Sequence, residues 1–443
     1  MASHKIKIRR LAASLCSGVW RGDAVRDRVT RALHGGPPDP ARLTARLLLR
    51  FDAHQPPTAA EMEAMLAGDA EVRAALDRSD DPDLPAILLD PPVMHPPADR
   101  RISLPLPRIE TWRDLRQWLG VFDGELAWFA DREGRQADVV EPRLHHYRYR
   151  WLAKPAGGWR LIEQPKTRLK AIQRQILRGV LDRVPPHPAA HGFRRGHSCR
   201  SHAAVHTGRA VVLRMDLQHF FTSVPVARIG AMFRRLGYPA GVAHLLQSLC
   251  THCLSPPLAA APDGALNWEQ RQRLRAKHLP QGAPTSPALA NLCAWRLDCR
   301  LDGLARRFGL DYSRYADDLA FSGPHGLVAN VDFIEGMVGA IALEEGFRVN
   351  HRKTHLATRS QCQRLTGIVV NARPNLDRRA FDRLRATLHN CARYGPAGQN
   401  RDGVADFRAH LAGRLAYARW LNPDKARRLE RLWRQIDWPS DGD

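Results

Sequence analysis

Two carboxylates, Asp317 and Asp318, stand side by side in the sequence. Apolar stretches typical of strands flank them at 310–315 and 319–321, and Ala316 allows a tight hairpin between the two. Carboxylates at a hairpin tip repel each other, which is costly unless a cation neutralises them. Asp is also common in ordinary polar turns. The pair alone therefore leaves both a metal site and a surface turn open.

A third carboxylate, Asp216, ends an apolar run over 211–216 that is typical of a buried strand. Burying an unpaired carboxylate is expensive, so a bound cation is favoured there. Mg²⁺ prefers oxygen ligands, and a pair of such ions can activate an attacking hydroxyl and stabilise leaving pyrophosphate. Neighbouring strand residues point to opposite faces. We therefore expect Asp317 to share two Mg²⁺ ions, or substituting Mn²⁺ ions, with Asp216, while Asp318 holds one ion or lies behind it.

The charge of the chain indicates a polyanionic partner. The 443 residues include 68 Lys and Arg against 45 Asp and Glu, a formal net charge of +23. Such an excess favours nucleic acid, although an acidic lipid surface would also attract it. No apolar run approaches the roughly 18 residues that cross a bilayer, and the basic N-terminus lacks a convincing signal-peptide core. We expect a cytoplasmic protein without a membrane partner.

The cysteines give no sign of a disulfide framework or a complete metal site. Eight of them are scattered along the chain, which favours reduced thiols. Cys250 and Cys253 flank His252 and look like half of a zinc site, but no second pair follows at a finger-like spacing. We expect partly buried thiols there instead of zinc.

The order of the patterns predicts an α+β protein with helical ends. Thr58 and Glu61 predict a capping box that opens a helix reaching about Asp77. From Tyr147 onward, short strand patterns alternate with longer helical ones. Recurring prolines favour an extended linker before that region. The predicted regions are a helical N-terminal extension (1–79), a Pro-rich linker (80–110), the main domain (111–374) and an Arg-rich helical segment (375–443).

The run 312–322, Tyr-Ser-Arg-Tyr-Ala-Asp-Asp-Leu-Ala-Phe-Ser, resembles the palm hairpin of bacterial retron-type reverse transcriptases. Further blocks occur in that family's order, and the similarity covers about 112–417. The resemblance implies a right-hand polymerase, with fingers and an antiparallel-sheet palm in 111–374 and a helical thumb in 375–443. It implies an RNA-directed DNA polymerase that uses deoxynucleoside triphosphates.

The same resemblance implies contacts from the fingers to the incoming nucleotide. The block 154–162 is similar to the fingers hairpin, whose basic residues hold the triphosphate. Arg160 suits a bidentate phosphate contact, with Lys154 as a point charge beside it. A surface hairpin with routine charges is the alternative. The block 191–198 matches a loop near the template and triphosphate, where glycines allow close backbone approach.

Three more residues match positions near the nucleotide. Phe221 stands where the family places an aromatic steric gate against the ribose 2′-hydroxyl, and neighbouring Phe220 is expected to pack in the core. Gln281 opens a block that contacts the nascent base pair. Lys353 matches a lysine near the leaving phosphates, where a general-acid role and a plain phosphate or structural role both remain open.

Two motifs bear on RNA recognition. Retron enzymes carry Asn-Ala-x-x-His before the first metal strand and Val-Thr-Gly after the palm. This chain has His202-Ala-Ala-Val-His206 and Leu365-Thr366-Gly367, each with the first residue changed. The resemblance links His202, His206, Thr366 and Gly367 to recognition of a structured non-coding RNA. The departures leave open whether the chain follows a standard retron cycle.

The resemblance further implies a structured RNA as template, a DNA product, and a role in antiviral defence with an accessory or effector protein. Other functions are a group II intron-like reverse transcriptase, a template-free DNA polymerase, and an RNA-binding scaffold without turnover. No endonuclease-like cysteine cluster follows the predicted thumb, which argues against a self-sufficient intron enzyme.

Overall fold

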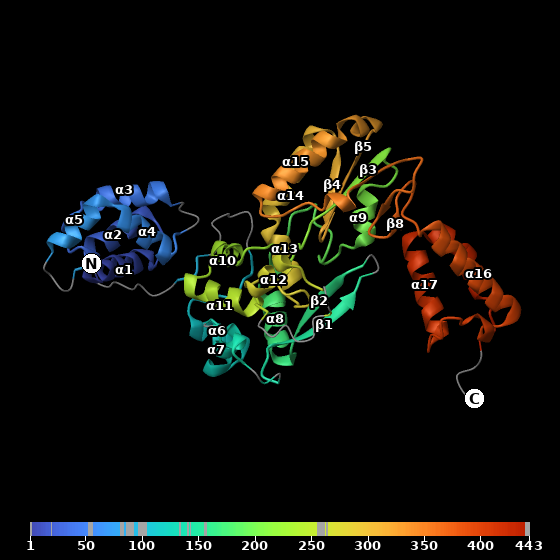
Figure 1. Ribbon diagram of the computed structural model, residues 1–443, viewed down its shortest axis with the longest axis horizontal. Coiled ribbons are helices and arrows are strands. Elements are labelled where there is room, and N and C mark those ends of the chain that lie inside the picture. Colours follow the sequence, from blue (N-terminus) through green and yellow to red (C-terminus); the bar gives the residue numbers. More distant parts are fainter. Residues whose placement is uncertain are drawn as a thin grey trace. The chain divides into compact units, whose positions relative to one another are not determined.

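The chain divides into two compact units, Met1–Pro185 with Val224–Leu289, and Pro186–Ser223 with Ala290–Asp443 (Figure 1). The predicted α+β class is confirmed. The computed structural model describes residues 2–18, 20–51, 56–79, 84–85, 93–95, 104–132, 134–139, 141, 143–154, 157–254, 262 and 265–438. Most of the expected Pro-rich linker lies outside these residues, but Pro85, Pro105 and Pro107 lie outside helices and strands, as expected.

Helices at the start of the first unit pack around a core of their own, which includes Leu11, Val29 and Leu47. The predicted capping box is confirmed, since Thr58 Oγ1 accepts from the Glu61 amide at 3.2 Å and Glu61 accepts from the Thr58 amide at 2.7 Å. The helix does not reach the predicted end, because Asp69 caps a new helix. The helices are α1 (Ala2–Cys16), α2 (Gly22–Ala32), α3 (Pro40–Arg50), α4 (Ala59–Gly68) and α5 (Ala70–Arg78).

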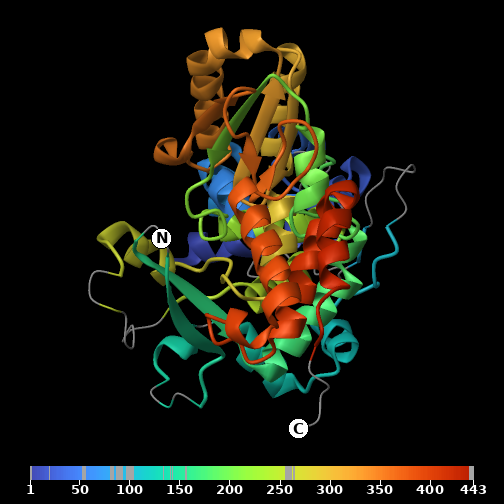
Figure 2. The ribbon, with the colours of Figure 1, turned by 90° about the vertical axis from the view of Figure 1, so that its right-hand side faces the viewer.

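The rest of the first unit combines helices with the antiparallel hairpin β1–β2, whose register pairs Tyr147 with Pro165 and Ala153 with Trp159. This hairpin is the long teal ribbon pair in Figure 2. Its strands are β1 (Tyr147–Ala153) and β2 (Trp159–Pro165), and its helices are α6 (Trp112–Leu119), α7 (Asp123–Ala130), η1 (Arg135–Ala137), α8 (Thr167–Gly179), η2 (Leu181–Arg183), α10 (Val226–Arg235), α11 (Ala240–Cys250), α12 (Trp268–Arg275) and α13 (Ser286–Cys293), which crosses the boundary between the units.

The second unit contains an antiparallel sheet in the order β4-β5-β3-β6. Alternate β4 side chains point to opposite faces: Arg314 contacts Asp298 of α14, whereas Ser313 contacts His202 of α9. The two helices therefore cover opposite faces of β4. The strands are β3 (Val211–Asp216), β4 (Asp311–Tyr315), β5 (Asp318–Gly323), β6 (His355–Thr358), β7 (Arg364–Leu365) and β8 (Ile368–Val369), and the helices are α9 (Cys199–Val205), α14 (Trp295–Arg307), η3 (His325–Asn330), α15 (Val331–Glu344) and η4 (His351–Lys353).

The C-terminal segment is helical, as the sequence predicts, and has a separate core that includes Phe381, Leu388, Leu411 and Leu429. The elements are α16 (Arg378–Tyr394), η5 (Ala397–Gln399), α17 (Phe407–Leu421) and α18 (Pro423–Trp433).

One helical stretch among the described residues, His325–Glu344, is long and apolar enough to cross a membrane by length and composition alone. Asp332 and Glu335 interrupt its apolar residues, so the sequence has no unbroken apolar run there. A single stretch of this kind says little about a membrane, since core helices of other proteins meet the same criterion.

Candidate active site

The strands of the second unit bring the three carboxylates to one end of the sheet. Asp216, the last residue of β3, is the register partner of Asp318, the first residue of β5. Asp317 lies in the β4–β5 turn, and its carbonyl accepts a hydrogen bond from the Leu217 amide at 2.9 Å. Ala316 takes a positive φ of 58°, which closes the turn tightly. The expected hairpin is confirmed, and it carries the carboxylate pair at its tip.

The surroundings of Asp317 and Asp318 disfavour the charged form of both carboxylates. Burial raises the pKa of Asp317 above its ordinary value, and the nearby carboxylates of Asp216 and Asp318 raise it further. Burial also raises the pKa of Asp318, although the Arg214 guanidinium opposes that shift. Each ionised carboxylate at this place is therefore stabilised by a nearby cation.

Two cationic side chains meet this need. Lys353 Nζ lies 2.9 and 3.0 Å from the Asp216 carboxylate oxygens. Arg214 donates from Nε and Nη2 to Asp318 Oδ1 at 3.0 and 2.7 Å. Arg214 stands two residues before Asp216 in β3, so both side chains lie on the same face of the strand. That spacing could have pointed to Arg214 from the sequence, which otherwise gives no hint of this ion pair.

The carboxylates fit a divalent ion by their chemistry, because Mg²⁺ and Mn²⁺ prefer oxygen ligands. In the part of the chain that the structure describes, no three His, Cys, Asp or Glu side chains already converge on one point. Asp216 turns toward Lys353 and Asp318 toward Arg214. The Lys353 ammonium thus marks a place where positive charge is stabilised beside Asp216.

A loop after α15 holds Lys353 in this place. The Asn350 amide donates to the Asp216 carbonyl at 2.7 Å, and Asn350 Nδ2 donates to Asp216 Oδ1 at 3.4 Å. The Lys353 amide in turn donates to the Asn350 carbonyl at 2.9 Å. The loop is therefore fixed to the end of β3 through backbone bonds, and it delivers both side chains to the same carboxylate.

Phe221 belongs to a group of aromatic rings near the hairpin. Its ring centroid lies 6.1 Å from that of Phe193, which lies 6.3 Å from Tyr315. Phe220 is 3% exposed and stacks on Phe347 with centroids 5.6 Å apart, so its expected packing role is confirmed. Phe221, by contrast, is partly exposed.

Comparison with known proteins decides the family. The family model described as "Reverse transcriptase (RNA-dependent DNA polymerase)" matches residues 152–370. The chain is 41% identical over 338 residues to the Retron Mx65 reverse transcriptase of Myxococcus xanthus, covering 75% of this chain and 72% of that protein. The chain belongs to the retron reverse transcriptases.

Other relatives agree. The Retron Mx162 reverse transcriptase of the same organism is 35% identical over 339 residues, covering 73% of this chain and 66% of that one. The Retron Ec86 reverse transcriptase of Escherichia coli is 31% identical over 239 residues, covering 53% and 66%. This reverse transcriptase is an RNA-directed DNA polymerase that makes DNA on an RNA template. Its class has a right-hand polymerase fold and uses divalent metal ions.

The remaining nucleotide-binding residues expected in this reverse transcriptase belong to the first unit. Lys154 and Arg160 are exposed at the end of the β1–β2 hairpin. Gln281 lies on a loop against β2, where its carbonyl accepts from the Glu163 amide at 2.9 Å. A Cβ at Gly282, where φ is +134°, would lie 2.8 Å from the Glu163 carbonyl oxygen. Only glycine therefore lets this loop approach the strand so closely.

A buried ion pair reinforces the same loop. His278 Nε2 lies 3.0 Å from a Glu163 carboxylate oxygen, and both side chains are buried. Burial alone would lower the pKa of His278, but the Glu163 carboxylate raises it above its ordinary value. The nearby Cys250 is buried and Cys253 half-buried, which confirms the expected partly buried thiols.

The histidines of the first RNA motif lie inside the second unit. His206 Nδ1 lies 2.7 Å from Ser322 Oγ, and its Nε2 lies 2.7 Å from Ser313 Oγ. Ser313 Oγ also lies 2.7 Å from His202 Nδ1. Both imidazoles are 0% exposed, and burial lowers both pKa values. A role in RNA recognition stays a prediction for this pair, and burial restricts it to an indirect one that acts through the fold.

The second RNA motif forms the turn between β7 and β8. Thr366 and Gly367 take positive φ values of 47° and 84°, and Gly367 is exposed. Ala203 of α9 shares a buried cluster with Leu365 and Ile368 beside this turn. The two motifs therefore lie together in space, with the histidines in the interior and the Thr366–Gly367 turn at the surface.

Proposed function

We propose that this reverse transcriptase adds deoxynucleotides to a primer hydroxyl by two-ion nucleotidyl transfer at Asp216, Asp317 and Asp318. One observation carries the proposal. Two of these buried-strand carboxylates already hold cationic side chains at one end of the β3–β5 ladder, and the third has a pKa raised by burial and by its neighbours. A site of this kind attracts divalent cations.

In this proposal, the three carboxylates and Lys353 have different roles. Asp216 and Asp317 would hold two Mg²⁺ ions, with Mn²⁺ as a substitute, and Asp318 would lie behind them because Arg214 already binds it. When bound, such ions lower the pKa of the attacking hydroxyl and neutralise the leaving pyrophosphate. Lys353 lies beside Asp216, where its ammonium donors suit the leaving phosphates and can deliver a proton to them.

The family match over 152–370 supports a division of the chain into polymerase regions, which we propose as follows. We assign fingers and palm to 111–374, with the sheet β4-β5-β3-β6 as the palm, and the thumb to 375–443. Residues 1–79 are then an extension and 80–110 a linker. In this assignment Lys154, Arg160 and Gln281 bind the nucleotide from the fingers, and Phe221 rejects ribonucleotides from the palm.

The biological setting we propose rests on the retron relatives. The retron relatives support an RNA template. For that template we propose a structured non-coding RNA, and the turn with half-buried Thr366 and exposed Gly367 offers a surface for it. His202 and His206 would support that surface from within. A cytoplasmic role in antiviral defence, with an accessory or effector protein, completes the proposal. The retron relatives favour a retron-like polymerase over an intron-like enzyme, a template-free polymerase or a scaffold.

Primer extension tests the chemical proposal. Asp317→Asn should abolish Mg²⁺-dependent incorporation of dTTP on poly(rA)–oligo(dT), while RNA binding in a gel-shift assay stays unchanged. Asp311→Asn is the matched control, because Asp311 begins β4 of the same hairpin but pairs with Arg209 outside the site. Full activity of Asp317→Asn would refute the assignment.

Phage challenge tests the biological proposal. Deleting the complete locus should sensitise the host to some phages, and the Asp317→Asn form should fail to restore resistance. Unchanged sensitivity across a broad phage panel would remove the defence role and leave the chemistry standing.

A further inference from the structure

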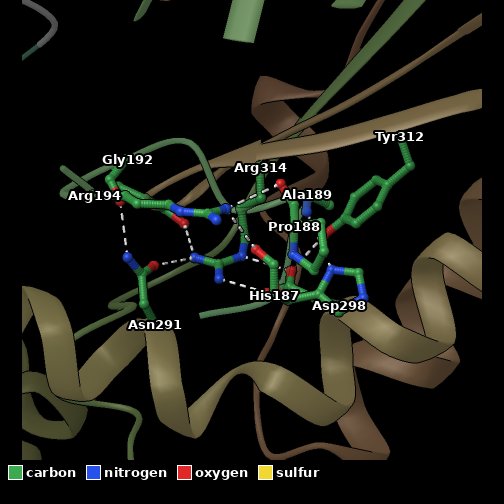
Figure 3. Close-up of polar contacts among 10 residues, drawn as sticks. His187, Pro188, Ala189, Gly192, Arg194, Asn291, Asp298, Tyr312 and Arg314 are labelled. Atoms are coloured by element: carbon green, nitrogen blue, oxygen red, sulfur yellow. Dashed lines mark hydrogen bonds and ion pairs between the residues drawn. The ribbon is translucent and has the colours of Figure 1, made fainter. Parts of the chain in front are cut away.

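A single guanidinium, that of Arg314, occupies the interior between β4 and α14 (Figure 3). Its Nε donates to Asp298 Oδ1 at 2.7 Å and its Nη2 donates to Asp298 Oδ2 at 2.6 Å. Both side chains are 0% exposed. Tyr312, on the same face of β4, donates its hydroxyl to Asp298 Oδ1 at 2.8 Å. The Asp298 carboxylate therefore balances the charge of Arg314 and fixes the orientation of its guanidinium group.

The fixed orientation aims the third nitrogen of Arg314 at the hairpin tip. Nη1 donates to the Ala316 carbonyl at 3.0 Å and to Asn291 Oδ1 at 2.9 Å. Ala316 directly precedes Asp317, and its positive φ is costly for a residue with a Cβ. The hydrogen bond from Arg314 to the Ala316 carbonyl stabilises this strained turn. The position of Asp317 therefore depends on that hydrogen bond.

Asn291 extends the network to the loop at 191–198. Asn291 Nδ2 donates to the Gly192 carbonyl at 2.8 Å. A Cβ at Gly192 would lie 2.6 Å from the Ala316 amide nitrogen, so the loop and the hairpin tip touch through their backbones. The His191 amide also donates to the Arg314 carbonyl at 2.8 Å. Arg314 thus holds the loop in two ways, directly through its own carbonyl and indirectly through its side chain and Asn291.

The guanidinium also touches the loop that follows β3. Its carbon lies 5.3 Å from the ring centroid of Phe220, a cation–π distance. Phe220 neighbours Phe221, and their ring centroids are 5.6 Å apart. Arg314 therefore meets three parts of the site: the hairpin tip, the 191–198 loop and the loop of the gate residue.

We propose that Arg314, oriented by Asp298, is a positioning residue that holds these three parts in one catalytic arrangement, an inference that rests on the two-ion function above. A buried ion pair that served stability alone could be exchanged for apolar side chains without loss. A planar fork with five donors that reaches separate segments has no apolar or lysine equivalent. The geometry points to alignment as the task of the pair.

The deciding experiment exchanges the pair for apolar side chains of similar size, in Arg314→Met/Asp298→Leu. The melting temperature of this double variant should be close to that of the wild type, as expected when apolar side chains replace a buried ion pair. The kcat for dTTP on poly(rA)–oligo(dT) should nevertheless fall by about 100-fold, because misplacement by about 1 Å has that effect. The Kd for the template–primer should stay within about threefold, and discrimination of dTTP against UTP should weaken.

Glu345→Gln is the matched control. Glu345 is a buried acid that accepts from Arg300 of α14 at 3.1 Å, yet that pair lies outside the hairpin network. The kcat of Glu345→Gln should stay within about threefold of the wild-type value, even if this variant loses as much stability as the double variant. If the double variant regains both stability and kcat, or loses no more kcat than the control, the positioning role is wrong. Asp317→Asn, tested beside them, would remain inactive in that case, so the two proposals fail separately.

Asn291→Ala decides the question if the double variant does not fold. It leaves the Arg314–Asp298 pair intact but removes two hydrogen bonds, the one from Arg314 Nη1 to Asn291 and the one from Asn291 to the Gly192 carbonyl. A loss of kcat well beyond that of Glu345→Gln supports the network, and restored activity in Asn291→Gln would strengthen it. Unchanged kcat in Asn291→Ala overturns the proposal.

Discussion

Acidification should weaken the second unit through its buried histidines, and the effect of His206 can be worked out. Burial, together with the smaller effects of His191 and Arg209, lowers the pKa of His206 from 6.5 to about 3. The unfolded chain therefore binds a proton between these two pH values, whereas the folded chain does not. Stability is complete above about pH 6.5 and is lost progressively as the pH falls toward 3.

The size of the loss follows from the same two values. Each pH unit below the unfolded pKa costs about 1.4 kcal/mol for one such group. At pH 5.0, which is 1.5 units below 6.5, His206 alone should cost about 2 kcal/mol of folding free energy. His202, whose pKa burial also lowers, acts in the same direction.

Amide hydrogen exchange of β4 and β5 provides a local measurement, since His206 bonds to Ser313 and Ser322 in those strands. Between pH 7.5 and 5.0, the opening free energy of these amides should drop in the wild type by about 2 kcal/mol from His206, with a further drop from His202. The total drop should shrink by about 2 kcal/mol in His206→Gln and stay unchanged in His389→Gln, a control on the exposed face of α16. An equal drop in wild type and His206→Gln would refute the reasoning.

Other substitutions probe the gate, the Gln281 loop and the N-terminal helices. Phe221→Ala should admit ribonucleotides, measured as the kcat/KM ratio of dTTP to UTP, and an unchanged ratio would reject the gate. Gly282→Ala places a Cβ 2.8 Å from the Glu163 carbonyl oxygen, so we expect a loss of about 1–3 kcal/mol in urea unfolding. A neutral effect would contradict that contact. Thr58→Ala removes a helix cap and should destabilise the N-terminal helices by about 1 kcal/mol. Primer extension should stay unchanged, and a large loss would show that these helices serve catalysis.

Local patterns in the sequence predict much of this site. The apolar run ending at Asp216 gives a strand, and the short interval around Ala316 gives a hairpin, because both depend on neighbouring residues alone. The capping box at Thr58 is predictable for the same reason. The break at Asp69 is not, because apolar residues continue at helical spacing across it. There the cap side chain, which accepts from two amides, ends one helix and starts the next.

Pairings between distant segments escape such patterns. The bond between Arg214 and Asp318 exists because β3 and β5 pair in one register, which brings residues 104 positions apart together. His202 and His206 look like surface recognition residues when their motif is considered alone. Their burial becomes understandable only once Ser313 and Ser322 are seen to supply partners from two strands. Polar side chains can be buried in a core when hydrogen-bond partners are present there.

The two faces of β4 explain why polar groups, not only apolar ones, hold this hairpin. Arg314 bonds to Asp298 of α14 on one face. On the other face, Ser313 bonds to His202 of α9 and to His206, which follows that helix. A slip of one residue would turn every β4 side chain to the opposite face. Apolar packing could tolerate such a slip, but it would leave the Arg314 charge and the buried histidines without partners, which is far more costly. The two networks therefore specify the strand register, and with it the place of Asp317 at the tip.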